Sequence, residues 1–385
     1  MKHQKAVYLD YAAATPVDDQ VLKAMQPYWQ ERFYNPSANY MAGRLVADDL
    51  KLARRRVAAV LGSKPTEIIF TAGGTEADNL AIDGIMQQYP QASLLVSAVE
   101  HEAILQAAQR YDHKLIPVDK KAVVRLDELG QLIDDNTVLI SVMHANNELG
   151  SIQPLPKVAS LIKKVRQQRQ KTGNKLPLYL HSDASQTPNY LAVKVSRLGV
   201  DLLTINGGKL YGPKQTGALF VRSGLRLLPV IRGGGQERGL RSGTENLAAI
   251  VGLVTALELA QEGQQAESKR LAQLQQLFEA ELQKAVPRLV INSVGNRLPN
   301  IVHVTIPEAD NEQLMMQLDE QGIICAVGSA CSASKDEPSH VLQAIGLSSA
   351  QAQSSLRFSM GRSTTKEQLL RVVQVLAGLV TKNQG

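Results

Sequence analysis

The stretch VDLLTINGGKLYGPK, residues 200–214, combines an apolar strand pattern with a lysine held among glycines. The run that ends at Asn206 predicts a buried strand of a parallel sheet. Lys209 follows directly, where the glycines let the backbone come close to a ligand. A lysine so placed can form a Schiff base with an aldehyde cofactor, although lysine in such a loop is more often a solvated turn residue. The stretch therefore predicts a strand of the sheet that is followed directly by a candidate reactive lysine.

Six further β-rich runs occupy the same part of the chain. Longer segments with apolar residues at helical intervals lie between them, at 75–88, 101–110 and 157–170. This alternation predicts an α/β fold with a mostly parallel, seven-stranded sheet covered by helices. Functional groups in such sheets collect at the carboxyl ends of the strands. The six runs are 67–71, 93–98, 114–118, 138–144, 176–182 and 217–222.

The pattern changes after residue 245. A helical stretch covers 245–285, and shorter strand-like and helical units follow up to a last helix. This order is typical of an α+β unit, so a second domain is expected to start within the long helix near residue 260. We expect a large cofactor-binding domain over 15–260 and a smaller α+β domain formed by 1–14 and 261–385.

The composition excludes several classes of protein. Only two cysteines occur, Cys325 and Cys331, which are too few for a disulfide framework and lack the spacing of a metal site. No run of about 18 apolar residues and no signal-peptide pattern is present, so we expect a cytoplasmic protein without a membrane segment. The net charge of +6 is small for this length, and we expect no direct binding of nucleic acid.

Two more motifs suit a cofactor with a pyridine ring and a phosphate. Asp183 lies in HSDAS at the end of an apolar strand, where it either holds a pyridine nitrogen protonated or caps a turn. In FTAGGTEADN, Gly73, Gly74 and Thr75 stand between a strand and a helix start, where backbone N–H groups and the Thr75 hydroxyl suit an anion. The alternative is a plain N-cap. The dinucleotide pattern GxGxxG and the Walker pattern GK[ST] are both absent.

Further motifs run in order through nearly the whole chain. They are YLDYAAATP, YNPSANYMAGR, FTAGGTEADNLAI, VEHEAI, MHANNELGSIQP, HSDASQ, GGKLYGPKQTGALFVR, GGGQERGLRSGTEN, GSACSASKDEPSHVL and SSLRFSMGR. The set resembles the class V branch of the fold-type I pyridoxal-phosphate (PLP) enzymes, and within it the cysteine desulfurases of the NifS/IscS kind. This resemblance implies an aspartate aminotransferase-like fold and the cofactor PLP. It also implies conversion of L-cysteine to L-alanine.

The resemblance also implies roles at matching positions. Lys209 would be the Schiff-base lysine, and His101 would stack on the cofactor ring and carry a proton. Arg357 and Asn35 would bind the substrate carboxylate. Thr244 would reach the phosphate in the neighbouring subunit of a homodimer. The remaining cofactor-binding positions are Asp183 at the pyridine nitrogen, Gln186 and Asn147 at the ring hydroxyl, and Gly74, Thr75 and Asn206 at the phosphate.

The two cysteines differ in their surroundings. Cys331 lies in the small, polar segment GSACSAS, whereas Cys325 lies in the apolar run IICAV. A nucleophilic thiol needs access and a thiolate form, and a thiol in apolar surroundings is inert. Cys331 also matches the family's persulfide-forming cysteine. The persulfide sulfur would then pass to an acceptor protein, such as an iron-sulfur scaffold, a tRNA-thiolating enzyme or a thiamine-pathway protein.

The chain departs from the family at the phosphate. The family usually has serine and histidine where Asn206 and Gly208 stand here, so either PLP is held less tightly or another donor compensates. Selenocysteine or cysteine sulfinate as substrate stays open. A non-catalytic sulfur-relay scaffold is disfavoured because the lysine, the aspartate, the histidine and the cysteine are all present. Cys331 argues against an ordinary aminotransferase.

Overall fold

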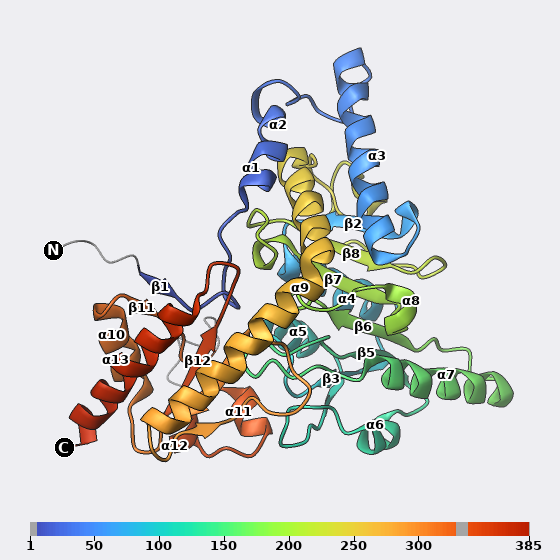
Figure 1. Cartoon of the computed structure of the whole chain (residues 1–385). Coiled ribbons are helices and arrows are strands. Elements are labelled where there is room, and N and C mark those ends of the chain that lie inside the picture. Colours follow the sequence, from blue (N-terminus) through green and yellow to red (C-terminus); the bar gives the residue numbers. More distant parts are fainter. Residues whose placement is uncertain (1–5, 329–337, 385) are drawn as a thin grey trace.

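The computed structural model describes residues 6–328 and 338–384 (Figure 1). Its centre is a seven-stranded sheet in the order β2-β8-β7-β6-β5-β3-β4. β8 runs antiparallel to both of its neighbours, and the remaining pairs are parallel. The predicted mostly parallel sheet of seven strands is confirmed. The strands are β2 (Ile68–Thr71), β3 (Ser93–Ser97), β4 (His113–Ile116), β5 (Thr137–Ser141), β6 (Tyr179–Asp183), β7 (Leu202–Asn206) and β8 (Gly217–Val221).

Helices cover both faces of this sheet (Figure 1). Alternate side chains of a strand point to opposite faces, so Ile68 and Phe70 pack in one apolar cluster and Ile69 packs in another. The first cluster takes in side chains of α3, α7 and the beginning of α9, and the second takes in those of α4 and α5. These helices are α3 (Met41–Leu61), α4 (Gly74–Met86), α5 (Glu102–Ala108), α7 (Leu155–Thr172) and α9 (Leu247–Ala285).

A second apolar core lies apart from the large sheet. It is built around a three-stranded sheet of order β12-β10-β9 and a parallel pair of β1 and β11, so the N-terminal strand joins the C-terminal part of the chain. The elements are β1 (Val7–Tyr8), β9 (Val290–Ile291), β10 (Ile301–Thr305), α10 (Asn311–Glu320), β11 (Ile323–Ile324), β12 (Ser355–Ser359) and α13 (Lys366–Gln384). Two short helices of the same part of the chain, α11 (His340–Ala344) and α12 (Ser349–Ala352), pack instead in the core of the large sheet, through Val341, Leu342 and Ala352.

Helix α9 connects the two cores. Leu253 and Leu257 pack in the core of the large sheet, whereas Leu271 and Phe278 pack in the second core. The helix therefore changes its packing partner between residues 257 and 271. This change supports the division that we propose, in which residues 15–260 form the large domain and residues 1–14 and 261–385 together form the small domain.

Three helices form an arm at the top of the molecule in Figure 1, namely α1 (Asp19–Met25), α2 (Pro27–Gln30) and α3. The arm presents large apolar side chains to solvent, with Trp29 60% exposed, Phe33 63% and Met41 80%. The remaining short elements are α6 (Leu126–Leu132), α8 (Val195–Leu198), η1 (Pro65–Glu67), η2 (Gly207–Lys209) and η3 (Glu237–Gly239).

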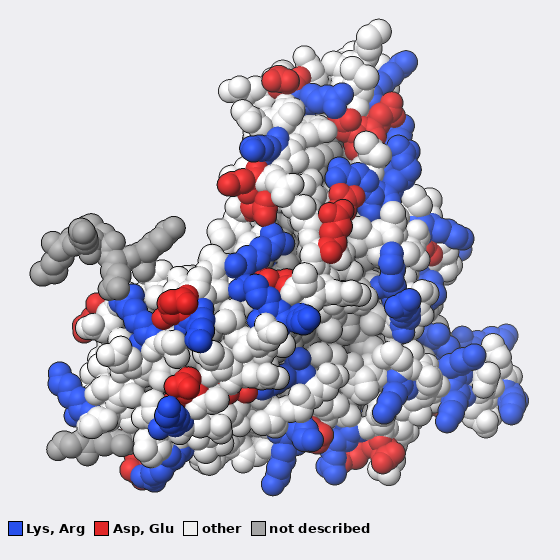
Figure 2. Space-filling view, in the orientation of Figure 1, with Lys and Arg blue, Asp and Glu red and all other residues white. Residues whose placement is uncertain are grey.

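Charged side chains are mixed over most of the face drawn in Figure 2, although basic ones gather around α7 at the lower right. That helix carries no acidic residue between Leu155 and Thr172. Over the described ranges, no helix has the length and apolar character needed to cross a membrane.

Candidate active site

The carboxyl ends of neighbouring strands bring the predicted polar residues together. β6 ends at Asp183 and its parallel neighbour β7 ends at Asn206, with Asp183 paired to Thr204 in the register. The lysine loop follows β7 as the short helix η2. The structure thus forms the predicted constellation at one sheet edge, where ligands bind in folds of this kind.

One end of the site is the start of α4. Gly73 precedes the helix with φ of +133°, a conformation that L side chains rarely adopt. Next to it, a Cβ added to Gly74 would lie 3.1 Å from Asn206 Nδ2 and 3.1 Å from Ser185 Oγ. Glycine at 74 therefore leaves room for these two side chains beside the first-turn N–H groups. Such a helix N-terminus favours an anion.

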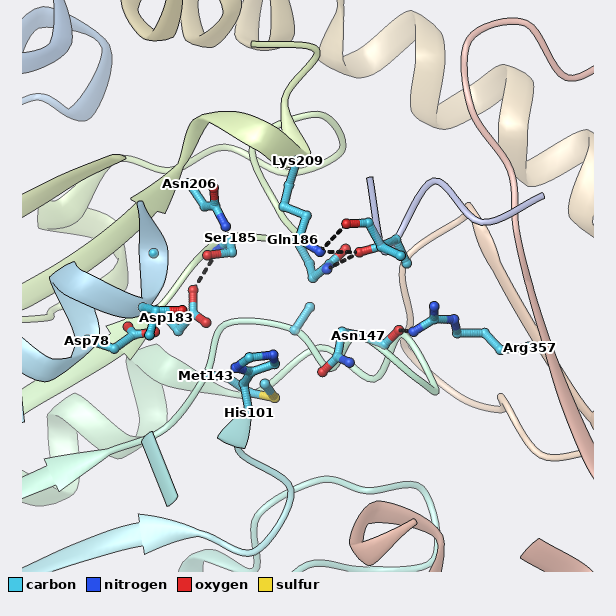
Figure 3. A pocket seen from close by; sticks show the side chains of 15 residues that line it. Asp78, His101, Met143, Asn147, Asp183, Ser185, Gln186, Asn206, Lys209 and Arg357 are labelled. Carbon is cyan, nitrogen blue, oxygen red and sulfur yellow. Dashed lines mark hydrogen bonds between the residues drawn. The ribbon is translucent and has the colours of Figure 1, made fainter. Parts of the chain in front are cut away.

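Lys209 points into the site and is held by the N-terminal segment (Figure 3). Its Nζ donates hydrogen bonds to the carbonyl oxygens of Ala12 at 2.8 Å and Ala13 at 2.6 Å. Gln186 Nε2 donates to the same Ala12 oxygen at 2.9 Å. Asn189 Nδ2 fixes the lysine backbone by donating to the Lys209 carbonyl at 2.8 Å. The segment after β1 is thus a wall of the site.

Asp183 lies beside two other buried carboxyl groups. Its Oδ1 accepts a hydrogen bond from the Ser185 N–H at 2.7 Å. Burial and the negative charge of Asp183 raise the pKa of Asp78 well above its ordinary value. Burial raises the pKa of Glu100 to about 8, although Glu100 accepts a hydrogen bond from the Met143 N–H at 2.6 Å. Both neighbours therefore favour their neutral forms, which limits the negative charge around Asp183.

His181, which lies beside Asp78, is neutral for the same reason. Burial lowers the pKa of His181 to about 3, although its Nε2 lies 3.7 Å from Asp78 Oδ1. His181 contacts Ser141 Oγ at 2.9 Å and Thr204 Oγ1 at 3.1 Å. It therefore acts as a packed hydrogen-bonding group and not as a cation.

His101 is the N-cap of α5. Its Nδ1 accepts a hydrogen bond from the Ala103 N–H at 3.1 Å. With Nδ1 engaged as an acceptor, the neutral ring carries its hydrogen on Nε2. Figure 3 shows the ring at the floor of the cavity, below Lys209. Nε2 is thus the ring atom through which His101 can exchange a proton without losing its cap bond.

Arg357 closes the opposite end of the site. It comes from β12, is 1% exposed, and donates from Nη2 to Asp10 Oδ1 at 2.6 Å. Its Nη1 donates to the Asn147 carbonyl oxygen at 3.0 Å, and its Nε has no partner among the described residues. A guanidinium in this position has donor capacity left for a carboxylate.

These residues enclose one cavity of about 160 Å³ (Figure 3). Ser185 and Asp78 also line the cavity. Both lie inside quoted motifs, but no local pattern marks them as site residues, because their surroundings depend on neighbours from other elements. The predicted residues that line the cavity are Gly74, Thr75, His101, Asn147, Asp183, Gln186, Asn206, Lys209 and Arg357.

Two of the predicted residues that the structure describes, Asn35 and Thr244, do not line this cavity. Asn35 is exposed between α2 and α3, where its Oδ1 accepts a hydrogen bond from the Ser37 N–H at 2.9 Å. Thr244 is also exposed, and it follows Arg241, whose Nε lies 2.9 Å from Glu76 in the first turn of α4. Cys331 lies outside the described residues. The roles of these three residues stay predictions.

Comparisons with known proteins identify the family of this chain. The aminotransferase class-V family model matches residues 7–372. The chain is 39% identical to the cysteine desulfurase IscS of Dictyoglomus turgidum over 387 residues, covering 98% of this chain and 95% of that protein. It is 35% identical to the cysteine desulfurase NifS of Azotobacter vinelandii, covering 98% of this chain and 93% of that protein.

Solved structures show the same likeness. A NifS-like protein superposes with a TM-score of 0.89 at 31% identity, covering 98% of this chain and all of that chain. SspA in complex with cysteine superposes with a TM-score of 0.80 at 34% identity, covering 92% of this chain and 98% of that chain. The chain belongs to the aminotransferase class-V family, among the cysteine desulfurases of the IscS and NifS kind.

Proposed function

We propose that the protein is a PLP-dependent cysteine desulfurase that converts L-cysteine to L-alanine and keeps the sulfur as a persulfide on Cys331. The observation that carries this proposal is the single cavity that joins Lys209, Asp183, His101 and Arg357. Its relatives are named cysteine desulfurases, and SspA was solved with cysteine. A non-catalytic sulfur-relay scaffold would not need these four residues in one cavity, so the cavity favours an enzyme over a scaffold.

The residues present fit PLP. The first turn of α4 with Ser185 and Asn206 offers donors for a phosphate. The carboxyl group of Asp183 suits a pyridine nitrogen, and the Lys209 amine suits an aldehyde. Asn147 and Gln186 also line the cavity, and their side-chain amides suit the hydroxyl group on the PLP ring. When bound, PLP supplies an electron sink for the carbon atoms of the substrate.

Lys209 is the residue that we assign to movement of the α-proton. The Ala12 and Ala13 carbonyl oxygens accept hydrogen bonds from Nζ, and they bind the ammonium form more strongly than the neutral amine. An amine that has taken a proton is thus held in the site. His101 Nε2 is the candidate carrier of the proton that moves with sulfur, since the cap bond occupies only Nδ1.

Arg357 is the residue that we assign to the substrate carboxylate. Its guanidinium is fixed by Asp10 and the Asn147 carbonyl before any substrate arrives. These bonds lower the conformational entropy that is lost when a carboxylate binds, because the long side chain is already held in place. Asp10 is therefore a positioning residue for Arg357.

Sulfur transfer requires a second nucleophile. In the proposed step the Cys331 thiolate bonds to the sulfur of L-cysteine, the bond between carbon and sulfur breaks, and its electron pair leaves with the carbon, which then takes up a proton to give alanine. Cys325 does not suit this task, because it is 7% exposed and burial raises the pKa of its thiol to about 12. The persulfide sulfur would then be delivered in the cytoplasm to an acceptor protein such as an iron-sulfur scaffold or a tRNA-thiolating enzyme.

The exposed apolar arm supports a homodimer. Trp29, Phe33 and Met41 are more than half exposed, and monomeric proteins rarely leave a large apolar patch in water. A homodimer would cover such side chains and would allow Thr244 to serve the neighbouring site. Sedimentation at low concentration tests this part: a fully active monomer would contradict it.

The direct test of the reaction is incubation of the purified protein with PLP and L-cysteine. Alanine should appear, and mass mapping should find one added sulfur on Cys331. Absence of alanine, or added sulfur only on Cys325, would overturn the proposal. The same incubation with a Cys331→Ser variant is the matched control.

A further inference from the structure

The phosphate end of the cavity differs from the family pattern. Asn206 and Gly208 stand where the family usually has serine and histidine. We propose that Ser185 replaces the missing imidazole and that its hydroxyl, together with the Asn206 amide, donates to the cofactor phosphate. This inference rests on the proposed function, because it assumes that PLP is the ligand.

The position of Ser185 carries the first step. The side chain is 8% exposed and lines the cavity, and its Oγ lies 3.1 Å from the point where a Cβ on Gly74 would stand. Its own backbone N–H is bound to Asp183 Oδ1, so the turn that aims the hydroxyl is fixed. Among the described residues, no group bonds to Ser185 Oγ. Buried hydroxyl groups normally have a partner.

Asn206 carries the second step. Its Oδ1 accepts a hydrogen bond from the Gly208 N–H at 3.2 Å. This bond turns the other end of the amide, Nδ2, toward Gly74 at 3.1 Å from the same Cβ point. Nδ2 has no acceptor among the described residues. Gly208 therefore acts through its backbone by orienting the Asn206 amide.

The groups that converge here are all donors. The Asn206 amide and the Ser185 hydroxyl lie beside Gly74 at the start of α4, where the first-turn N–H groups of the helix are donors too. Figure 3 shows the two side chains next to each other. One anion satisfies all of them at once, and a phosphate has enough oxygen atoms to do so. The donor set is thus complete without a side chain at position 208.

Steric crowding does not explain why residue 208 is a glycine. A Cβ added there would have Lys214 Cα and Cγ as its nearest neighbours at 3.6 Å, which is ordinary contact. A histidine can therefore be introduced at this position to test whether it substitutes for Ser185.

The experiment measures binding of PLP and of pyridoxal, which lacks the phosphate, to cofactor-free protein by their absorbance changes. Ser185→Ala should weaken PLP binding about 10-fold or more, because a hydrogen bond to a charged group is lost. Binding of pyridoxal should be unchanged. The matched control is Ser182→Ala, because Ser182 is buried in β6, three residues before Ser185, but does not line the cavity, and it should leave PLP binding unchanged.

The double variant Ser185→Ala with Gly208→His should regain most of the PLP affinity. If the wild type binds no PLP, the proposed function fails. If the wild type binds PLP and Ser185→Ala binds it equally well, the inference about Ser185 is overturned while the proposed function stands. An equal loss of PLP and pyridoxal binding would also overturn it, since that result indicates a structural role.

Discussion

Glu100 offers a sharp test of the buried carboxyl cluster. Its pKa rises from 4.5 to about 8, mainly through burial. Between these values the unfolded chain has released the proton that the native protein retains, so the free energy of unfolding falls as pH rises and levels off above about pH 8. At about 1.36 kcal/mol per pH unit, the whole loss is on the order of 5 kcal/mol.

Glu100→Gln should remove this loss. Glutamine keeps an acceptor for the Met143 N–H, which now bonds to Glu100 Oε1 at 2.6 Å, and it resembles the protonated acid. Near pH 5 the two proteins should therefore differ little. Toward pH 8 the variant should become more stable than the wild type by several kcal/mol. Urea unfolding of cofactor-free protein over this range measures the difference, since bound ligand adds its own contribution.

The control is Glu312→Gln, because Glu312 is exposed in the first turn of α10. This variant should follow the wild type at every pH. A stability difference between Glu100→Gln and the wild type that stays constant with pH would refute the assignment of a raised pKa to Glu100.

The remaining predictions concern the reaction. Lys209→Ala should lose the visible absorbance of the bound cofactor, and a borohydride-reducible cofactor adduct on another lysine would contradict its assignment. Cys331→Ser should bind PLP but release almost no alanine, because a hydroxyl is a far weaker nucleophile. Cys325→Ser should keep turnover at a cost of about 1 to 3 kcal/mol in stability, as urea unfolding would show. Asp10→Ala should raise KM for L-cysteine more than it lowers kcat, because Arg357 loses its anchor; an unchanged KM would argue against a positioning role.

The strands of the large sheet were predictable because each is a short run of apolar residues, which is the pattern that a buried strand requires. Residues 217–221, for example, are apolar on both faces, as a strand covered on both sides requires. Motif order was also readable from the chain, and it predicted the family that the comparisons confirm. Most of the cavity-lining residues belong to these motifs.

The chain by itself thus determined the large sheet, the family and most of the residues that line the cavity, since each depends on neighbours in sequence. Only the tertiary structure decided how those residues are held. Arg357 is bound to Asp10 across 347 positions, and Lys209 is bound to Ala12 across 197. The pairing of β1 with β11 brings the N-terminal segment to the site, and no local pattern reports such a contact. Ser185 comes to lie beside Gly74 and Asn206 for the same reason, because α4 and β7 must first pack next to it.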